Sequence, residues 1–103
     1  MPIVPRALLN EAAQRFKLLS EPVRLELLNH LHATGEMPVQ ALVEATGHNQ
    51  ANVSKHLLLM ARAGLLHRRQ EGLYVYYSIK DPTIQSLCLL VCSRLQQEET
   101  TEG

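Results

Sequence analysis

The stretch from Asn49 to Tyr77 limits the possible folds of this chain more than any other. It begins with amides and a hydroxyl, continues with apolar residues at helical spacing, and breaks at Gly64. A basic run follows, and then a run rich in β-branched and aromatic residues, with Glu71-Gly72 between them. Apolar residues that recur every three or four positions indicate an amphipathic helix, and β-rich runs around a glycine indicate a hairpin. The stretch therefore predicts a helix from Gln50 to about Ala63, followed directly by a β-hairpin.

Two helices are expected before this stretch. The first runs from Arg6 to about Leu19, where apolar residues recur at helical spacing. Ser20 is expected to cap the second, and Pro22 stands in its first turn, where a missing N–H is tolerated. The sequence ATGE at 33–36 is expected to end it.

Two further helices complete the predicted fold. Pro38 is expected to open a short third helix, and Thr46-Gly47 to end it, because glycine relieves the left-handed backbone strain found there. Asp81-Pro82 is a strong start for the last helix, and residues 98–103 are expected to form a frayed tail. The sequence therefore predicts one domain over residues 1–103 that is mainly α-helical and carries a β-hairpin wing. Four helices, a hairpin and a fifth helix, in that order, form a winged helix-turn-helix.

The basic residues are unevenly spread, although the net charge of the chain is zero. Between His48 and Lys80, five lysines and arginines stand against one acidic residue, Glu71. A basic cluster of this kind is the electrostatic signature of a nucleic-acid contact. No apolar run approaches ~18 residues, and the first residues do not form a secretory signal. We therefore expect a cytoplasmic protein without a membrane contact.

The predicted fourth helix carries the side chains that a DNA-reading helix needs. Amide, hydroxyl and lysine side chains in its first two turns can meet base edges in the major groove. The candidates are Asn49, Gln50, Asn52, Ser54 and Lys55. On the hairpin, Arg68 and Arg69 are expected along the DNA backbone or in the minor groove, and Tyr74 or Tyr76 at a phosphate. Each helix residue alone is equally explained as a cap or as solvated surface, but the whole set favours DNA.

Two segments, LSEPVRLELLNHL and NQANVSKHLLLMARAGLLHRRQEGLYVYYSI, together with the closing helix, resemble the ArsR/SmtB family of bacterial repressors. The resemblance covers about residues 6–97, and Arg24 of EPVRLELL is a second anchor. It implies a symmetric homodimer with an interface of first and fifth helices, and two recognition helices in successive major grooves of a palindromic operator. The apolar faces left over on both terminal helices suit such a dimer independently. Family members usually carry polar residues in place of Leu58 and Leu59, which either pack under the wing or form an exposed patch.

Members of this family often respond to metal ions, and their familiar sites are missing from this chain. The third-helix site needs a cysteine pair, and the corresponding segment, EMPVQAL, has none. At the fifth-helix zinc site Asp81 matches one ligand, but Thr83, Arg94 and Gln97 stand at the others, and arginine does not bind zinc. We therefore expect Asp81 to act as a helix cap. The five histidines are expected at the surface or toward DNA.

Cys88 and Cys92 are four residues apart on the predicted last helix, so they share a face with Cβ atoms ~5–6 Å apart. One interpretation is that both fill an interface as small apolar residues. The other is a thiol switch, in which an oxidant, reactive sulfur or a soft ion such as Cu(I) or trivalent arsenic repacks the last helices and releases DNA. A disulfide within the helix is strained, because its Cβ atoms should approach to ~3.5–4.5 Å. Relatives that sense reactive sulfur also use a second-helix cysteine, whereas this chain has Asn29 there.

Other functions stay open from the sequence. One is a constitutive repressor with structural cysteines, and another is a winged helix that binds a protein through Leu58 and Leu59. The basic cluster favours DNA over the second of these. The sequence has no phosphate-binding glycine loop and no nucleophile with a base and an orienting group, so we do not expect an enzyme. No cofactor is expected other than the soft ion.

Overall fold

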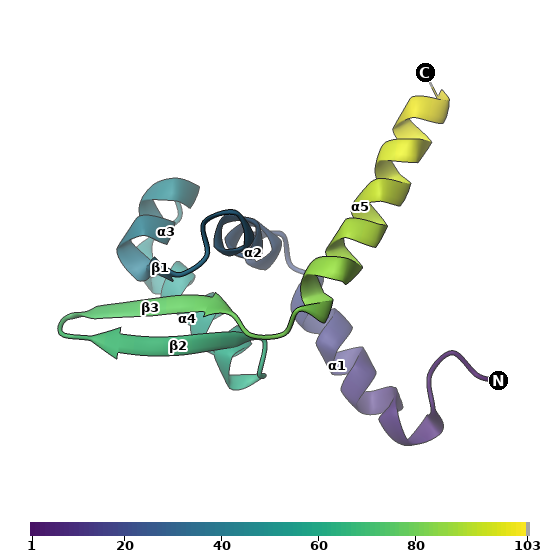
Figure 1. Ribbon diagram of the computed structural model, residues 1–103, viewed down its shortest axis with the longest axis horizontal. Coiled ribbons are helices and arrows are strands. Elements are labelled where there is room, and N and C mark those ends of the chain that lie inside the picture. The colour runs from purple at the N-terminus through teal and green to yellow at the C-terminus, as the bar shows by residue number, and fades with distance from the viewer. Residues whose placement is uncertain (103) are drawn as a thin grey trace.

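The computed structural model describes residues 1–102, with side chains through residue 99. Its elements are, in chain order, a short 3-10 turn η1 (Arg6–Leu8), helices α1 (Leu9–Leu19) and α2 (Pro22–Thr34), strand β1 (Met37–Pro38), helices α3 (Val39–Thr46) and α4 (Gln50–Arg62), strands β2 (Leu66–Glu71) and β3 (Tyr74–Ile79), and helix α5 (Thr83–Glu102). The pair α3 and α4, followed by the hairpin of β2 and β3, confirms the predicted winged helix-turn-helix. Figure 1 shows the hairpin at one end of the molecule and both α1 and α5 at the other.

The sheet has three antiparallel strands in the order β1-β3-β2. Glu71 pairs with Tyr74, so the hairpin turns through two residues, and Gly72 takes a left-handed φ of 61°. The sequence reasoning missed β1. Pro38, which was expected to open the third helix, is the N-cap of α3 with an extended ψ of 158°, so that prediction is confirmed, and the same residue pairs with Tyr76 on β3.

The core lies between α2, α3, α4 and the sheet. Its largest fully buried side chains are Leu27, Leu31, Leu42, Val53, Leu57, Met60 and Leu65. Full burial of a leucine is worth about 1.5–3 kcal/mol relative to exposure, so these side chains supply much of the driving force for folding. The predicted inner stripe of α4 is confirmed at Val53, Leu57 and Met60, each 0% exposed.

Two predictions about helix starts have opposite outcomes. Ser20 does not cap α2, because its hydroxyl donates a 2.7 Å hydrogen bond back to the Lys17 carbonyl and closes α1. Asp81 does act at the start of α5, where it accepts hydrogen bonds from the N–H and the hydroxyl of Thr83 at 3.0 and 2.6 Å. Its other carboxylate oxygen accepts a 2.7 Å bond from Arg15 of α1.

Glycine ends three helices in this structure. Gly35, Gly47 and Gly64 have φ values of 94°, 76° and 86°, which L-residues with side chains rarely adopt. The predicted ends at Gly47 and Gly64 are therefore confirmed. Helix α5 extends to Glu102, through residues that were expected to form a frayed tail. No glycine or proline interrupts α5, and its glutamines and glutamates are good helix formers. Gly103 lies outside the described residues.

Helix α5 leaves the body of the molecule after its first turns. Ile84 is 3% exposed, and Leu87 and Cys88 pack against the core, but every described side chain from residue 89 to 99 is exposed. Figure 1 shows the helix projecting away from the rest of the chain. No helix in the described part of the chain has the length and apolar character that a membrane span requires.

Candidate DNA-binding interface

The first turn of α4 is held by its own cap, and the first two turns carry the polar side chains. Asn49 Oδ1 accepts a 2.8 Å hydrogen bond from the Asn52 N–H, so the predicted cap is confirmed. Gln50 and Lys55 are exposed, and Asn52 and Ser54 are half-buried. The cap occupies the oxygen of the Asn49 amide, which leaves its nitrogen to donate to a base or phosphate.

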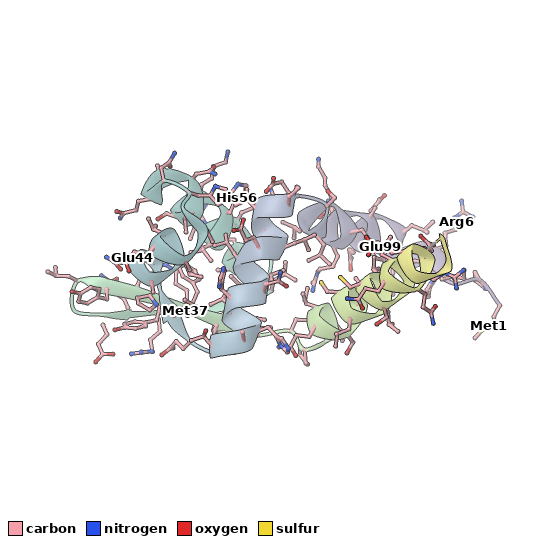
Figure 2. All side chains as sticks on the ribbon, turned by 90° about the horizontal axis from the view of Figure 1, so that it is seen from above. Met1, Arg6, Met37, Glu44, His56 and Glu99 are labelled. Carbon is pink, nitrogen blue, oxygen red and sulfur yellow. The ribbon has the colours of Figure 1, made fainter. Side chains whose placement is uncertain are left out.

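Two side-chain pairs fasten α4 and the turn before it to α2. His48 Nε2 lies 3.1 Å from Glu26 Oε2, and Arg24 Nε donates to His56 Nδ1 at 3.1 Å. Figure 2 shows His56 beside the end of α2 that follows α1. Arg24 also donates from Nη1 to the Leu18 carbonyl at 3.3 Å, so one guanidinium joins the end of α1, α2 and α4.

His56 corrects one prediction of the sequence analysis, which placed all histidines at the surface or toward DNA. It is 7% exposed, because it follows Val53 by three residues and shares the inner face of α4. Burial is the main cause that lowers the pKa of His56. The negative charge of Glu21 acts to raise this pKa, and the positive charge of Arg24 lowers it further. Since Nδ1 accepts from Arg24, the neutral ring carries its proton on Nε2, which lies 3.7 Å from a buried oxygen of Glu21.

The two wing arginines have different environments. Arg68 pairs with Tyr77 and Arg69 with Tyr76, so their side chains leave opposite faces of the sheet. Arg68 Nε donates to the Tyr77 hydroxyl at 3.3 Å, and none of the described carboxylates forms an ion pair with it. Its terminal nitrogens are therefore available to a phosphate.

The guanidinium of Arg69 is bound by carboxylates of the protein itself. It donates to Glu36 and Glu71 and lies 4.6 Å from the centre of the Tyr76 ring. The hydrogen bond from Arg69 is the largest cause of the lowered pKa of Glu36. Tyr74 is 51% exposed near the wing tip, whereas Tyr76 is half-buried beneath Arg69. Sequence reasoning missed Glu36, because 33 residues separate it from Arg69 and only the sheet register brings them together.

Leu58 and Leu59 were left undecided between two environments. Leu59 is 41% exposed and lines an open groove with Leu18 of α1 and Arg62, while Leu58 is half-buried. Leu59 therefore faces α1 rather than the wing.

The two cysteines line one pocket of about 120 Å³ between α2 and α5. Around them stand the side chains of Leu28, Asn29, His32 and Ile84. Cys88 is half-buried, and burial, followed by the neighbouring Cys92, raises the pKa of its thiol. Cys92 is exposed. Among the side chains that the structure describes, no three His, Cys, Asp or Glu residues gather as a metal site.

Large apolar residues are exposed on both terminal helices. On α1 and the turn before it these are Leu8, Leu9 and Phe16, each about half exposed (47–55%). On α5 they are Leu89, Leu90, Val91 and Leu95, with exposures of 53–71%. So many large apolar side chains on two neighbouring elements mark an interaction surface.

Comparisons with known proteins agree with this geometry. A family model described as HVO_A0114 matches residues 19–79. The chain is 31% identical over 83 residues to the transcriptional repressor PagR of Bacillus anthracis, which covers 81% of this chain and 83% of PagR. The relatives are transcriptional regulators and not enzymes.

Solved structures extend the similarity to almost the whole chain. The antimony-specific transcriptional repressor AntR superposes with a TM-score of 0.87 at 27% identity, covering 97% of this chain and 90% of AntR. The homodimeric winged helix-turn-helix DNA-binding domain of Mb0332 from Mycobacterium bovis, described as a possible ArsR-family regulator, has a TM-score of 0.77 at 33% identity. It covers 94% of this chain and 92% of that domain. The capped helix-turn-helix, the wing and the similarity to these relatives together show that the chain belongs to the ArsR/SmtB family of winged helix-turn-helix transcriptional repressors.

Proposed function

We propose that this protein is a cytoplasmic homodimer that represses transcription by binding a palindromic operator through α4 and the wing. We further propose that modification of Cys92 and Cys88 releases it from DNA. The observation that carries the DNA contact is the first two turns of α4. Its backbone is held by the Asn49 cap, while Gln50 and Lys55 face solvent. An N-terminal helix turn with amides, lysine and a partial positive charge suits both base edges and phosphates.

The dimer is supported by the apolar set on the terminal helices. Val91 and Leu95, one turn apart on the same face of α5, are 53% and 54% exposed, and Phe16 of α1 is 55% exposed. A twofold axis through this surface would bury all three and would leave the wings at the outer ends. The homodimeric domain from Mycobacterium bovis is one precedent with the same fold.

The release mechanism starts from the difference between the two thiols. Cys92 is exposed, whereas Cys88 is half-buried with a raised pKa, so Cys92 meets an incoming reagent first. Hydrogen peroxide, for example, oxidises the Cys92 thiol to a sulfenic acid and is itself reduced to water. A second thiol then condenses with the sulfenic acid, which forms an S–S bond and releases a second water.

A direct bond between Cys88 and Cys92 is strained within one helix turn. Two products avoid this strain: a bond to a cysteine of the partner subunit, or a longer sulfur bridge between the two residues. The pocket of about 120 Å³ beside both thiols offers room for additional sulfur atoms. The pair also suits a soft ion such as Cu(I) or trivalent arsenic. Because the described side chains gather no third ligand, any further protein ligand would come from the partner subunit.

The path from thiols to DNA runs through α2. Leu28 and Asn29 of α2 line the cysteine pocket, and the same helix holds α4 through Arg24 and His56. A change in packing between α5 and α2 would therefore shift α4, and with it the spacing of the two recognition helices. A coupling free energy of about 1–3 kcal/mol would suffice for release.

One observation favours a second candidate, a constitutive repressor with structural cysteines. Cys88 packs against the core, and burial raises the pKa of its thiol, which makes it less reactive. The two candidates differ only in the response to thiol reagents.

The DNA contact is tested by fluorescence anisotropy with labelled DNA from upstream of the protein's own coding sequence, across a series of salt concentrations. Each phosphate contact contributes a slope of about −0.9 in log K against log salt. Lys55→Gln should reduce the slope by about that amount, while Lys17→Gln on α1 is the matched control and should not. A DNA affinity that does not change with salt concentration, together with an unchanged affinity of the Lys55→Gln variant, would instead support a protein-binding role.

Release is tested in the same assay with hydrogen peroxide, polysulfide, arsenite or Cu(I), each with and without reductant. Wild type should leave the DNA with at least one reagent, and Cys88→Ser/Cys92→Ser protein should stay bound. Equal release of both proteins would exclude the thiol mechanism. Retention of wild type under every reagent would establish the constitutive repressor.

A further inference from the structure

The wing of this protein is tied to the body by one arginine. Arg69 Nε donates to Glu36 Oε2 at 3.0 Å, and Nη2 donates to Glu36 Oε1 at 2.7 Å. Its third nitrogen, Nη1, donates to Glu71 Oε2 at 2.5 Å. The guanidinium also lies over the Tyr76 ring at 4.6 Å. Every nitrogen of the side chain therefore has a carboxylate partner, and one flat face rests on an aromatic ring.

This environment is unfavourable for a contact between Arg69 and DNA phosphate. Two carboxylates surround one guanidinium, so the cluster as a whole carries a net negative charge. A phosphate would have to replace a bidentate carboxylate pair, which is among the strongest hydrogen-bonded arrangements of arginine. Arg68, on the opposite face of the sheet, has no such partners among the described residues.

The position of Glu36 shows what the cluster does instead. Glu36 directly precedes β1, whose Met37 and Pro38 pair with Tyr77 and Tyr76 of β3. Arg69 lies on β2, on the far side of β3. The ion pair therefore crosses the whole sheet, from the segment after α2 to the outer strand of the wing. All residues from 67 to 74 are exposed, so the hairpin has little buried surface of its own to fix its direction.

We propose that Glu36 and Arg69 are positioning residues that clamp the wing at the angle at which Arg68 meets the DNA backbone. This inference rests on the proposed DNA binding. It takes Arg69 out of the set of phosphate contacts that the sequence suggested and adds Glu36, a residue outside the helix-turn-helix and hairpin. An exposed ion pair adds little to overall stability, so its effect should appear in DNA affinity rather than in folding.

The experiment measures operator affinity over a salt series for wild type, Glu36→Gln, Arg69→Gln, Arg69→Lys and Arg68→Gln. Without the clamp the wing becomes more mobile, and binding to DNA then has to order it at a cost in free energy. Glu36→Gln and Arg69→Gln should therefore each weaken binding roughly three- to tenfold. Neither should change the salt slope. Arg68→Gln should lower the slope by about 0.9, because it removes a phosphate contact. Arg69→Lys should fail to restore affinity, because lysine lacks the bidentate geometry.

A phosphate contact by Arg69 would give the opposite results. Glu36→Gln would then strengthen binding, because it frees a cation and removes a negative charge near DNA. Arg69→Gln would lower the salt slope, and Arg69→Lys would largely restore binding. Any of these three results would overturn the clamp.

Two further measurements separate the clamp from simpler explanations. The double variant Glu36→Gln/Arg69→Gln should bind DNA no more weakly than either single variant, because both break the same interaction. Additive losses would show that the residues act independently and would overturn the clamp. Circular dichroism and thermal melting should show wild-type folding for each variant. Failure of wild type itself to bind DNA would contradict the proposed function, whereas a binding wild type with reversed variant effects would contradict the clamp alone.

Discussion

Arg24 Nε donates a 3.1 Å hydrogen bond to His56 Nδ1, and this contact joins the first turn of α2 to the buried face of α4. Apart from Tyr77, His56 is the one buried residue with a polar side-chain group in the part of the chain that the structure describes, and the pair lies midway along the helix that is proposed to read DNA. The hydrogen bond requires a neutral imidazole, because a protonated ring has no acceptor for the Arg24 N–H. Protonation of His56 would therefore loosen α4 from α2.

The first prediction concerns pH. The pKa of His56 lies below its ordinary value of 6.5, mainly because burial disfavours the charged ring. Below about pH 6.5 the unfolded chain binds a proton that the folded chain does not, so the free energy of unfolding should fall as the pH falls. The contribution of neutral His56 to the free energy of unfolding should be fully present above about pH 6.5 and should decrease below it. Thermal melting at pH 5.5 and 7.5 measures the difference.

Two variants check that assignment. His56→Gln should be less stable than wild type at pH 7.5, yet its melting temperature should depend less on pH over this range. His67→Gln, which changes an exposed histidine on β2, should keep the wild-type dependence. An unchanged pH dependence in His56→Gln would show that other groups are responsible.

The second prediction separates capping from DNA contact at Asn49. Asn49→Ala removes the acceptor for the Asn52 N–H and should cost about 1 kcal/mol of stability, within a range of about 0.5–2. Asn49→Asp keeps the acceptor and should fold as stably as wild type, but its negative charge should weaken operator binding. Urea denaturation and anisotropy measure the two effects. Normal DNA affinity in the Asp variant would place Asn49 away from the phosphates.

The third prediction compares two leucines on the same helix. Leu57 is 0% exposed, so Leu57→Ala should lower the free energy of unfolding by about 2–5 kcal/mol, through lost burial and the cavity left behind. Leu59 is 41% exposed, and Leu59→Ala should change stability by only about 0.5 kcal/mol. Denaturant unfolding at one protein concentration tests both. Equal losses would mean that the Leu59 groove is closed in solution, for instance by the partner subunit.

The fourth prediction tests the dimer. Leu95 is 54% exposed and lies on the same face of α5 as the buried Ile84, three turns earlier. Leu95→Glu should place a charge in the proposed interface, convert the dimer to a monomer in sedimentation velocity, and greatly weaken operator binding. Ser93 stands about half a turn away around the helix, so Ser93→Glu is the matched control and should remain dimeric. A dimeric Leu95→Glu protein would place the interface elsewhere.

The sequence by itself determined most of the local structure. Asn49 as a cap, Gly47 and Gly64 as helix ends, and Asp81 at the start of α5 are all confirmed. The reason is that caps, glycine ends and apolar periodicity depend on interactions within about one turn of the chain, which the sequence displays directly. The same local rules misplaced Ser20, where α1 and α2 compete for one residue, and missed β1, which forms only by pairing with a distant strand.

Only the tertiary structure decided which polar residues meet. Arg24 and His56 are 32 residues apart, Glu36 and Arg69 are 33 apart, and Arg15 and Asp81 are 66 apart. Helix packing and strand register bring these pairs together, and neither leaves a periodic signal in the sequence around the individual residues. Two adjacent arginines that look alike in the sequence therefore differ in the fold, because consecutive residues of a strand face opposite sides of the sheet. Arg68 remains open to a phosphate, and Arg69 is held by Glu36.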